Sequence, residues 1–189
     1  MLIKKLDITS DSDLVLNDLN SLLPSMPTDV WNSKNQMGLR YRNNATNIWE
    51  DSVGSLFDYN LKTHVGFERD FTNWCINTDY YVRQEIEKLE NVLGIKTGRV
   101  RFMRLQPRKG LTIHRDSEER YHLVLKTNSN ALFGFAQSPT MNESSDLPAV
   151  GISYHIPKDN HWYKANTTEF HWVFNGGFEE RIHLVVSEI

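Results

Sequence analysis

The chain has 189 residues, the size of one domain around one hydrophobic core. Its composition, with 39% hydrophobic and 24% charged residues, excludes collagen-like and disordered classes of protein. A net charge of −3 supplies no overall basic field, so we do not expect a nucleic-acid partner. No apolar run approaches the roughly 18 residues of a membrane span, and the single cysteine, Cys75, suits a reducing compartment. We therefore predict a cytoplasmic protein that is not inserted in a membrane.

Two helices are predicted in residues 1–97. Apolar residues at helical spacing indicate one helix over residues 11–23 and a second that opens at Asp79 and ends at Gly94. Residues 26–77 show no regular period and are rich in aromatic residues, which predicts loops and short strands. Three tryptophans of this stretch are interpreted as anchors of those loops: Trp31, Trp49 and Trp74. We expect this part of the chain to be helical and loop support for the remainder of a single domain, residues 1–189.

Beyond Gly98 the hydrophobic period changes to two, the period of β-strands. The predicted strands span residues 99–105, 111–114, 120–127, 131–135, 150–156, 161–164, 170–174 and 180–187. Eight short strands after two helices favour a mainly β domain, whose core in residues 98–189 is a jelly roll or a related double-sheet barrel. The long polar gap over residues 137–149 indicates a functional or mobile loop.

A candidate metal site begins with His114 and Asp116, at the end of one predicted strand. Residues two apart on a strand point to the same side of the sheet, so the imidazole and the carboxylate can converge. Further on, the Asn-Gly-Gly run at residues 175–177 predicts the turn of a hairpin between the last two strands. A hairpin centred on the first of these glycines places His171 directly opposite Arg181 on one face.

These residues offer two imidazoles, one carboxylate and a nearby cation. Two histidines and a carboxylate that leave coordination positions open are the ligand set of non-haem Fe(II) oxygenases, which react with O2. A buried guanidinium is costly unless an anion meets it, and it binds a carboxylate through two parallel hydrogen bonds. A dicarboxylate whose 2-oxo acid end chelates the metal, while its far carboxylate meets Arg181, satisfies both requirements. That molecule is 2-oxoglutarate.

Three stretches carry a resemblance to a known family: RFMRLQPRKGLTIHRD, RYHLVLKTN and FHWVFNGGFEERIHLVV. In this order they resemble the 2-oxoglutarate/Fe(II)-dependent oxygenases, and specifically the aspartyl/asparaginyl β-hydroxylase branch of bacterial and phage type. The specific match covers residues 98–188, and a looser one extends over QMGLRYRNN, residues 54–56 and residues 68–71. The resemblance implies a double-stranded β-helix, cupin-like in architecture, with supporting α-helices. It also implies a dioxygenase that hydroxylates a C–H bond with 2-oxoglutarate and O2.

The resemblance also assigns site residues, with iron ligands His114, Asp116 and His171 and cosubstrate contacts Arg181, Arg120 and His122. Arg181 is expected to hold the distal carboxylate of 2-oxoglutarate, and the other two contacts lie near its opposite end. Two positions depart from the family pattern. Well-characterised members have glycine in place of Asp116, and a serine that donates a hydrogen bond to 2-oxoglutarate is replaced here by Met103. The distal carboxylate therefore depends on Arg181 alone or on another donor.

The prime substrate is unidentified at this level, and the family pattern allows an Asp or Asn side chain of a peptide or protein, or a small molecule. A cupin-like metal protein or non-oxygenase metalloenzyme acting on a small acid could use the same three ligands. A non-enzymatic binding module on the same scaffold fits less well, because the ligand set is complete.

Other conspicuous residues receive structural interpretations. Three histidines in the β region lack a carboxylate at strand spacing and are expected to be structural: His155, His161 and His183. The arginines interleaved with aromatic residues at 40–42 and 99–104 are expected to pair with local acids rather than with nucleic acid. Cys75 is expected to be a small buried hydrophobe.

Overall fold

The computed structural model describes residues 1–26, 28–58, 60–136 and 151–189. The elements before residue 97 are β1 (Ile3–Thr9), α1 (Ser12–Leu22), the 3-10 helix η1 (Leu23–Ser25), α2 (Thr28–Lys34), β2 (Gln36–Gly38), β3 (Arg40–Tyr41), β4 (Phe57–Asp58), β5 (Thr63–His64), η2 (Glu68–Asp70), β6 (Asn73–Trp74) and α3 (Tyr81–Leu93). Both predicted helices are confirmed. Asp11 caps α1 by accepting hydrogen bonds from the backbone N–H groups of Asp13 and Leu14. Gly94 ends α3 with a left-handed φ of 66°.

The second half of the chain is all strand and loop in its described part. Its strands are β7 (Thr97–Leu105), β8 (Lys109–His114), β9 (Arg120–Lys126), β10 (Ala131–Phe135), β11 (Ser153–Tyr154), β12 (His161–Ala165), β13 (His171–Asn175) and β14 (Arg181–Glu188). All eight predicted strands are found, with ends shifted by up to a few residues. The strand expected over residues 150–156 is shortened to β11. The polar gap at 137–149 lies outside the described residues.

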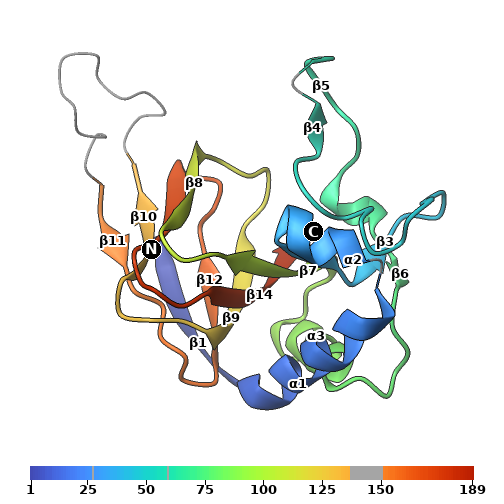
Figure 1. The fold of residues 1–189 in the computed structure, drawn as a ribbon, viewed down its shortest axis with the longest axis horizontal. Coiled ribbons are helices and arrows are strands. Elements are labelled where there is room, and N and C mark those ends of the chain that lie inside the picture. The colour runs from blue at the N-terminus through green and yellow to red at the C-terminus, as the bar shows by residue number, and fades with distance from the viewer. Residues whose placement is uncertain (27, 59, 137–150) are drawn as a thin grey trace.

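Two antiparallel sheets face each other (Figure 1). The larger sheet has the strand order β1-β12-β9-β14-β7-β2, and the smaller has the order β11-β10-β13-β8. Apart from β10 and β11, which are paired in the smaller sheet, successive strands of the second half alternate between the two sheets, which is the predicted double-stranded β-helix. The two short pairs β3-β6 and β4-β5 belong to the segment between α2 and α3. No helix in the described part of the chain is long and apolar enough to cross a membrane.

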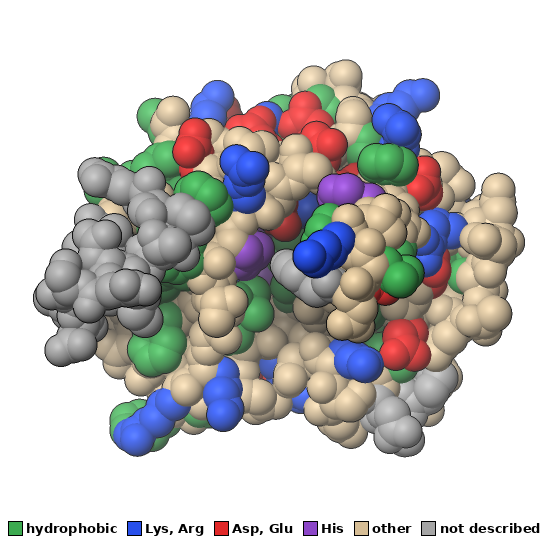
Figure 2. Space-filling model, turned by 90° about the horizontal axis from the view of Figure 1, so that it is seen from above, with side chains coloured by type: hydrophobic (Ala, Val, Ile, Leu, Met, Phe, Trp, Pro, Cys, Tyr) green, Lys and Arg blue, Asp and Glu red, His purple; other side chains and the backbone are tan. Residues whose placement is uncertain are grey.

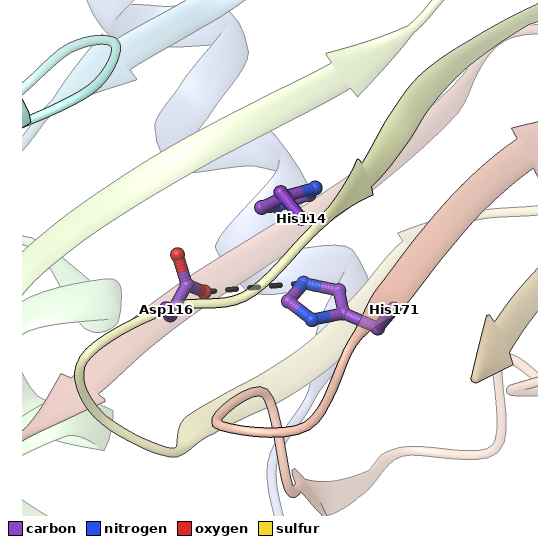
Figure 3. A group of neighbouring side chains, drawn as sticks. All are labelled: His114, Asp116 and His171. Carbon is purple, nitrogen blue, oxygen red and sulfur yellow. Dashed lines mark ion pairs between the residues drawn. The ribbon is translucent and has the colours of Figure 1, made fainter. Parts of the chain in front are cut away.

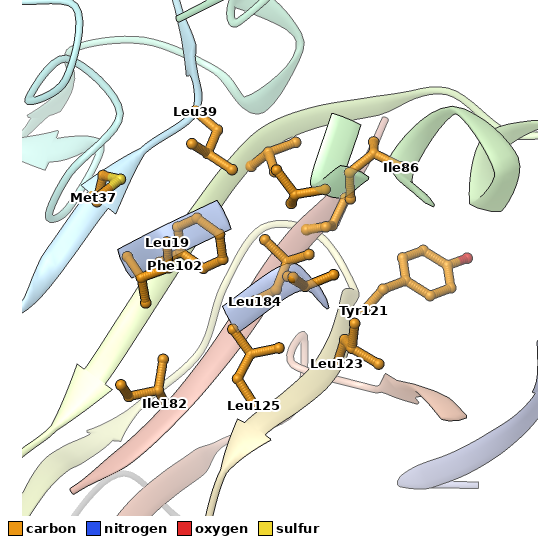
Figure 4. Close-up of a cluster of buried hydrophobic side chains, with 14 of the residues drawn as sticks. Leu19, Met37, Leu39, Ile86, Phe102, Tyr121, Leu123, Leu125, Ile182 and Leu184 are labelled. Atoms are coloured by element: carbon orange, nitrogen blue, oxygen red, sulfur yellow. The ribbon is translucent and has the colours of Figure 1, made fainter. Parts of the chain in front are cut away.

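The outer face of the larger sheet is packed against α1 and α3, which lie together beneath it in Figure 1. Alternate residues of β14 and its neighbours supply this apolar layer, and Figure 4 shows the side chains meeting those of the helices. Leu184 at its centre is completely buried. The fully buried side chains drawn there include Leu19, Ile86, Phe102, Leu123 and Leu184. Burial of these side chains is the main source of stability for the fold.

Two elements depart from the sequence-based expectation. Strand β1 is an addition to it, and it pairs with β12 through registers such as Ile3 with Ala165. Its buried Leu6 and Ile8 alternate with exposed residues, a period-two signal that is short but visible in the sequence. Residues 28–34, expected as loop, form α2, whose Val30 and Trp31 are buried against the core. A helix of seven residues makes only about two turns, which is too short to show a clear hydrophobic period in the sequence.

The predicted C-terminal hairpin is wrong. Strand β13 pairs with β10 and β8 in the smaller sheet, whereas β14 pairs with β7 and β9 in the larger one. His171 is therefore not the cross-strand partner of Arg181. The buried Asn175 side chain donates to the carbonyl oxygens of Leu105 and Glu179, at 3.1 and 2.7 Å, and so joins this turn to a neighbouring one. The Asn-Gly-Gly run marks a crossing between sheets rather than a hairpin turn.

Candidate metal centre

Two histidines meet across adjacent strands of the smaller sheet. His171 in β13 is the direct register partner of His114 in β8, and their ring centroids lie 4.2 Å apart. Asp116 follows β8 in a loop, where its backbone N–H donates to the carbonyl oxygen of Thr167 at 2.8 Å. Because Thr167 lies just before β13, this bond brings the Asp116 loop alongside the strand that carries His171.

The three side chains converge on one point (Figure 3). Their ligand atoms all lie within 4.8 Å of one another, and Asp116 Oδ2 is 4.0 Å from His171 Nε2. His114 Nδ1 lies 2.7 Å from the carbonyl oxygen of Thr112, and His171 Nδ1 lies 3.0 Å from that of Glu169. A carbonyl only accepts, so both Nδ1 atoms carry a proton and both Nε2 atoms offer a lone pair. Two imidazole nitrogens and a carboxylate oxygen fit a divalent transition metal.

Burial prepares His171 to act as a neutral ligand. Its side chain is almost fully buried, and this desolvation, together with the nearby His114, lowers the pKa of His171 to about 4. The ring is therefore neutral at physiological pH, the form that binds a metal ion. Phe133 stacks on it with an interplanar angle of 14° and a centroid distance of 5.4 Å, which fixes the plane of the ring.

Arg120 links this centre to a buried carboxylate that sequence reasoning missed. Its Nε lies 3.2 Å from Asp116 Oδ2, an ion pair without hydrogen-bond alignment, and its Nη2 donates to Glu68 Oε1 at 2.7 Å. Glu68 also accepts two bonds from Arg99, each 2.8 Å long, and one from the Ser187 hydroxyl at 2.7 Å. The looser family likeness at residues 68–71 was the only sequence signal for Glu68.

The cation network sets the charge of Glu68. Burial by itself raises the pKa of this carboxyl group, but hydrogen bonds from Arg99 and the charges of Arg120, Arg99 and Arg101 outweigh it and lower the pKa to about 2. Glu68 is therefore ionised at every physiological pH. One carboxylate from η2 thus forms ion pairs with two arginines of the larger sheet.

Arg181 and His122 lie on the inner face of the larger sheet, opposite the outer apolar layer. Arg181 is 6% exposed, and its Nη2 lies 3.0 Å from His183 Nδ1. Burial lowers the pKa of Arg181 to about 9, so it remains a cation at neutral pH. His122 in β9 is also buried, and its neighbours include His183 and Phe133. Burial, then the charge of Arg181, lowers the pKa of His122 well below its usual range.

The expectation that the arginines pair with local acids is correct for four of five. The ion pairs join Arg40 to Glu90, Arg42 to Asp51, Arg99 to Glu68, and Arg104 to Glu180. Arg101 is the exception, because it has no ion pair with any residue of the described ranges. Its Nη1 donates to Gln36 Oε1 at 3.1 Å and to the Gly54 carbonyl at 3.4 Å, and its Nε is buried without a partner.

The other residues interpreted as structural have hydrogen bonds or core contacts that fit this interpretation. His155 Nδ1 lies 3.0 Å from the Ala131 carbonyl, and His161 Nδ1 lies 2.9 Å from that of Asp159. Cys75 is partly buried, donates to the Ile48 carbonyl at 3.2 Å, and has a pKa raised to about 12 by burial. His183 differs from the other two histidines, because its ring contacts Arg181 and His122 instead of a backbone carbonyl. The tryptophans Trp31, Trp49 and Trp74 pack on the main core, as anchors of the loops should.

Figure 2 looks onto the face from which β4 and β8 rise in Figure 1. Histidine side chains reach the surface there beside a hollow near the middle of the face. His114 and Asp116 are both partly exposed, whereas His171 is buried. The candidate metal centre is thus open on one side and enclosed on the other, as a centre that admits small molecules requires.

Solved structures with the same fold cover nearly the whole chain. A 2OG-Fe(II) oxygenase family oxidoreductase from Burkholderia pseudomallei matches with a TM-score of 0.54 and 11% identity, over 98% of this chain and 83% of its own. AviO1 from Streptomyces viridochromogenes Tue57 matches with a TM-score of 0.52 and 10% identity, over 99% and 89%. A Pseudomonas putida prolyl-4-hydroxylase matches with a TM-score of 0.50 and 12% identity, over 98% and 91%. At such identities these likenesses show the fold alone, and a comparison with curated protein sequences finds no match.

The fold and the ligand geometry thus define a double-stranded β-helix protein with a candidate mononuclear metal centre. The model of the aspartyl/asparaginyl β-hydroxylase family matches residues 15–188, and the chain belongs to this family. The predicted function class, a 2-oxoglutarate-dependent hydroxylase, is confirmed. The chain is accordingly an enzyme of the oxygenase type.

Proposed function

We propose that His114, Asp116 and His171 bind Fe(II) and that the enzyme uses 2-oxoglutarate and O2 to hydroxylate a C–H bond. The supporting observation is the convergence of their three ligand atoms at the open side of the barrel. Bound Fe(II) supplies the oxidation, in which one oxygen atom of O2 enters succinate as CO2 leaves and the other enters the substrate. The residues of the chain bind the reactants, orient them and shield the centre from water.

The cosubstrate is proposed to lie between the metal and Arg181. Arg181 supports this role because it is a buried cation with no carboxylate partner in the described part of the chain. Such a group is stabilised strongly by a bound carboxylate. Arg120 and His122 are proposed to contact the cosubstrate near its metal-binding end. Arg120 already faces Asp116, which supports this placement.

The prime substrate is proposed to carry a carboxylate, with an Asp side chain of a peptide or protein as the favoured case. Arg101 supports this proposal, because it is 6% exposed and has only neutral hydrogen-bond acceptors. Glu68 is shared by Arg99 and Arg120, and Arg181 is assigned to the cosubstrate. Among the buried arginines of the described residues, this leaves Arg101 as the one without an anion. A neutral Asn amide satisfies such a cation less well than a carboxylate does.

The experiment that tests the metal centre measures succinate formed from 2-oxoglutarate by the purified protein with Fe(II) in air. We expect slow turnover without prime substrate, and loss of it to background in His114→Ala and in His171→Ala. His161→Ala is the matched control, because its ring contacts the carbonyl and carboxylate oxygens of Asp159, away from the three ligands, and its loss should leave turnover unchanged. Turnover at the wild-type rate in either ligand variant would exclude these residues as the metal ligands.

A second measurement tests the cosubstrate assignment. Arg181→Met removes the cation at similar length, so the dissociation constant for 2-oxoglutarate should rise about 30-fold, which corresponds to about 2 kcal/mol for a charge-assisted contact. Titration calorimetry with Mn(II) in place of Fe(II) measures binding without turnover. An unchanged constant would remove Arg181 from the cosubstrate site.

A cupin-like metal protein acting on a small acid without O2 is the competing function. Iron in the purified protein, with a visible absorption band that depends on 2-oxoglutarate, supports the oxygenase, and zinc without such a band supports the competitor. The location remains part of the proposal. The single cysteine, with its thiol protonated and partly buried, favours the cytoplasm.

A further inference from the structure

His183 is the one histidine outside the candidate metal centre that touches the proposed cosubstrate machinery. It is completely buried in β14, two residues beyond Arg181 and on the same side of the sheet. Its cross-strand partner in β7 is Met103, which has no hydrogen-bond donor to offer a cosubstrate. His183 therefore stands beside the position at which the family pattern expects a polar contact.

The bond to Arg181 fixes the protonation of this ring. Arg181 Nη2 lies 3.0 Å from His183 Nδ1, and a guanidinium can only donate. His183 Nδ1 must therefore be the bare acceptor, which places the single proton of the neutral ring on Nε2. Among the described residues, His183 is the only hydrogen-bond partner of the Arg181 side chain. No other hydrogen bond among the described residues orients that guanidinium.

Nδ1 of His183 also determines which ring nitrogen of His122 carries the proton. The two Nδ1 atoms of His122 and His183 lie 3.4 Å apart. Two bare nitrogens at this distance would repel each other, so His122 donates through Nδ1 and keeps a lone pair on Nε2. His122 Nε2 is buried and has no partner in the described ranges. The hydrogen bonds thus run from Arg181 and from His122 into one acceptor atom of His183.

We propose that His183 is a positioning residue, whose Nδ1 holds Arg181 in the orientation that receives the distal carboxylate of the cosubstrate and holds His122 in its Nδ1–H form. The proposal rests on the proposed function, because it gives Arg181 the cosubstrate carboxylate. A guanidinium that is already oriented loses less side-chain freedom when it binds an anion. His183 thus acts where the missing serine would have acted, but through Arg181 rather than through a contact of its own.

The test compares two substitutions of this residue. His183→Leu removes the acceptor, and we expect the dissociation constant for 2-oxoglutarate with Mn(II) to rise about tenfold while that for Mn(II) alone stays unchanged. His183→Asn places an amide oxygen near the position of Nδ1, so its constant should stay within about threefold of wild type. In turnover, His183→Leu should raise KM for 2-oxoglutarate and leave kcat nearly unchanged. His161→Leu is the control histidine and should bind as wild type does.

The outcomes separate this proposal from the proposed function. If Arg181→Met weakens binding and His183→Leu does not, the positioning role is wrong and the cosubstrate site stands. If Arg181→Met also binds normally, the cosubstrate site itself is wrong. A second measurement uses the wild-type protein, so it does not depend on whether a His183 variant folds. Imidazole ¹⁵N chemical shifts should show a proton on Nε2 of His183 and on Nδ1 of His122. A proton on Nδ1 of His183 would overturn the proposal.

Discussion

The two faces of the larger sheet are built from alternate residues of the same strands, yet they differ in chemistry: the outer face is apolar, whereas the inner face combines a smaller apolar cluster with buried charged and polar groups. In β14 the outward Ile182, Leu184 and Val186 belong to the main apolar core, whereas the inward Arg181 and His183 are buried among other polar groups. The outer face gains free energy by losing contact with water. The charges buried on the inner face lower the stability of the fold, because they have lost their hydration and are not fully paired while no ligand is bound. Along one strand, residues that stabilise the fold thus alternate with residues proposed to act in the functional site.

Leu184→Ala tests the outer face and should have the largest effect on stability. Leu184 is completely buried, so its truncation should lower the free energy of unfolding by about 3 kcal/mol. Urea denaturation measures the change, and the dissociation constant for the metal should stay unchanged in the folded variant. A loss below 1 kcal/mol would mean that the apolar layer is not the main source of stability.

Glu68→Gln tests the buried carboxylate that pairs with inner-face arginines, and the effect of the substitution on stability should depend on pH. The pKa of Glu68 is about 2 in the fold and near 4.5 when unfolded, so its ionised form stabilises the fold above pH 4.5. This contribution, about 3 kcal/mol, is lost as the pH falls from 4.5 toward 2. The gap in unfolding free energy between wild type and variant should therefore be largest at neutral pH and shrink with acid.

The matched control for that experiment is Glu87→Gln. Glu87 forms an ion pair with Arg83 on the surface of α3, and its side chain is 44% exposed. Such a pair contributes little, so the variant should follow the wild-type pH curve within about 0.5 kcal/mol. A Glu68→Gln gap that stays constant down to pH 2 would contradict the low pKa.

Arg101→Met tests whether an inner-face charge without an ion-pair partner lowers the stability of the enzyme when no substrate is bound. Replacing this guanidinium with an apolar side chain should raise the free energy of unfolding by about 1 kcal/mol when no substrate is bound. Arg99→Met is the contrasting variant, and it should lower that free energy by about 3 kcal/mol because Glu68 loses its two-bond partner. If both variants destabilise the protein equally, Arg101 is a structural residue and not a substrate contact.

Gly94→Ala should have the smallest effect and involves neither face directly. Gly94 ends α3 at a φ of 66°, where a side chain is strained, so the free energy of unfolding should fall by about 1 kcal/mol. Val92→Ala lies nearby on the exposed side of the same helix and should change it by less than 0.5 kcal/mol. A thermal melt resolves this difference, and equal values for the two variants would argue against a strained position.

Much of the second half of the chain could be predicted from its sequence, because the signals there are local. Alternating residues and turn residues set the strands within a few positions, and the spacing of His114 and Asp116 placed both at one strand end. The first half was harder, since α2 is only seven residues long and the pairs β3-β6 and β4-β5 contain two residues per strand. Elements this short carry too few residues to show a period.

The sequence by itself determined the strand pattern, the family and the set of candidate ligands. Tertiary structure alone decided which strands pair. As a result, His171 of β13 lies opposite His114 of the neighbouring β8, and not opposite Arg181 in a hairpin. It also decided that Glu68, far from Arg99 and Arg120 in the sequence, forms ion pairs with both. The physical reason is that strand periodicity is a property of neighbouring residues, whereas sheet crossings, buried ion pairs and imidazole protonation depend on groups that only folding brings together.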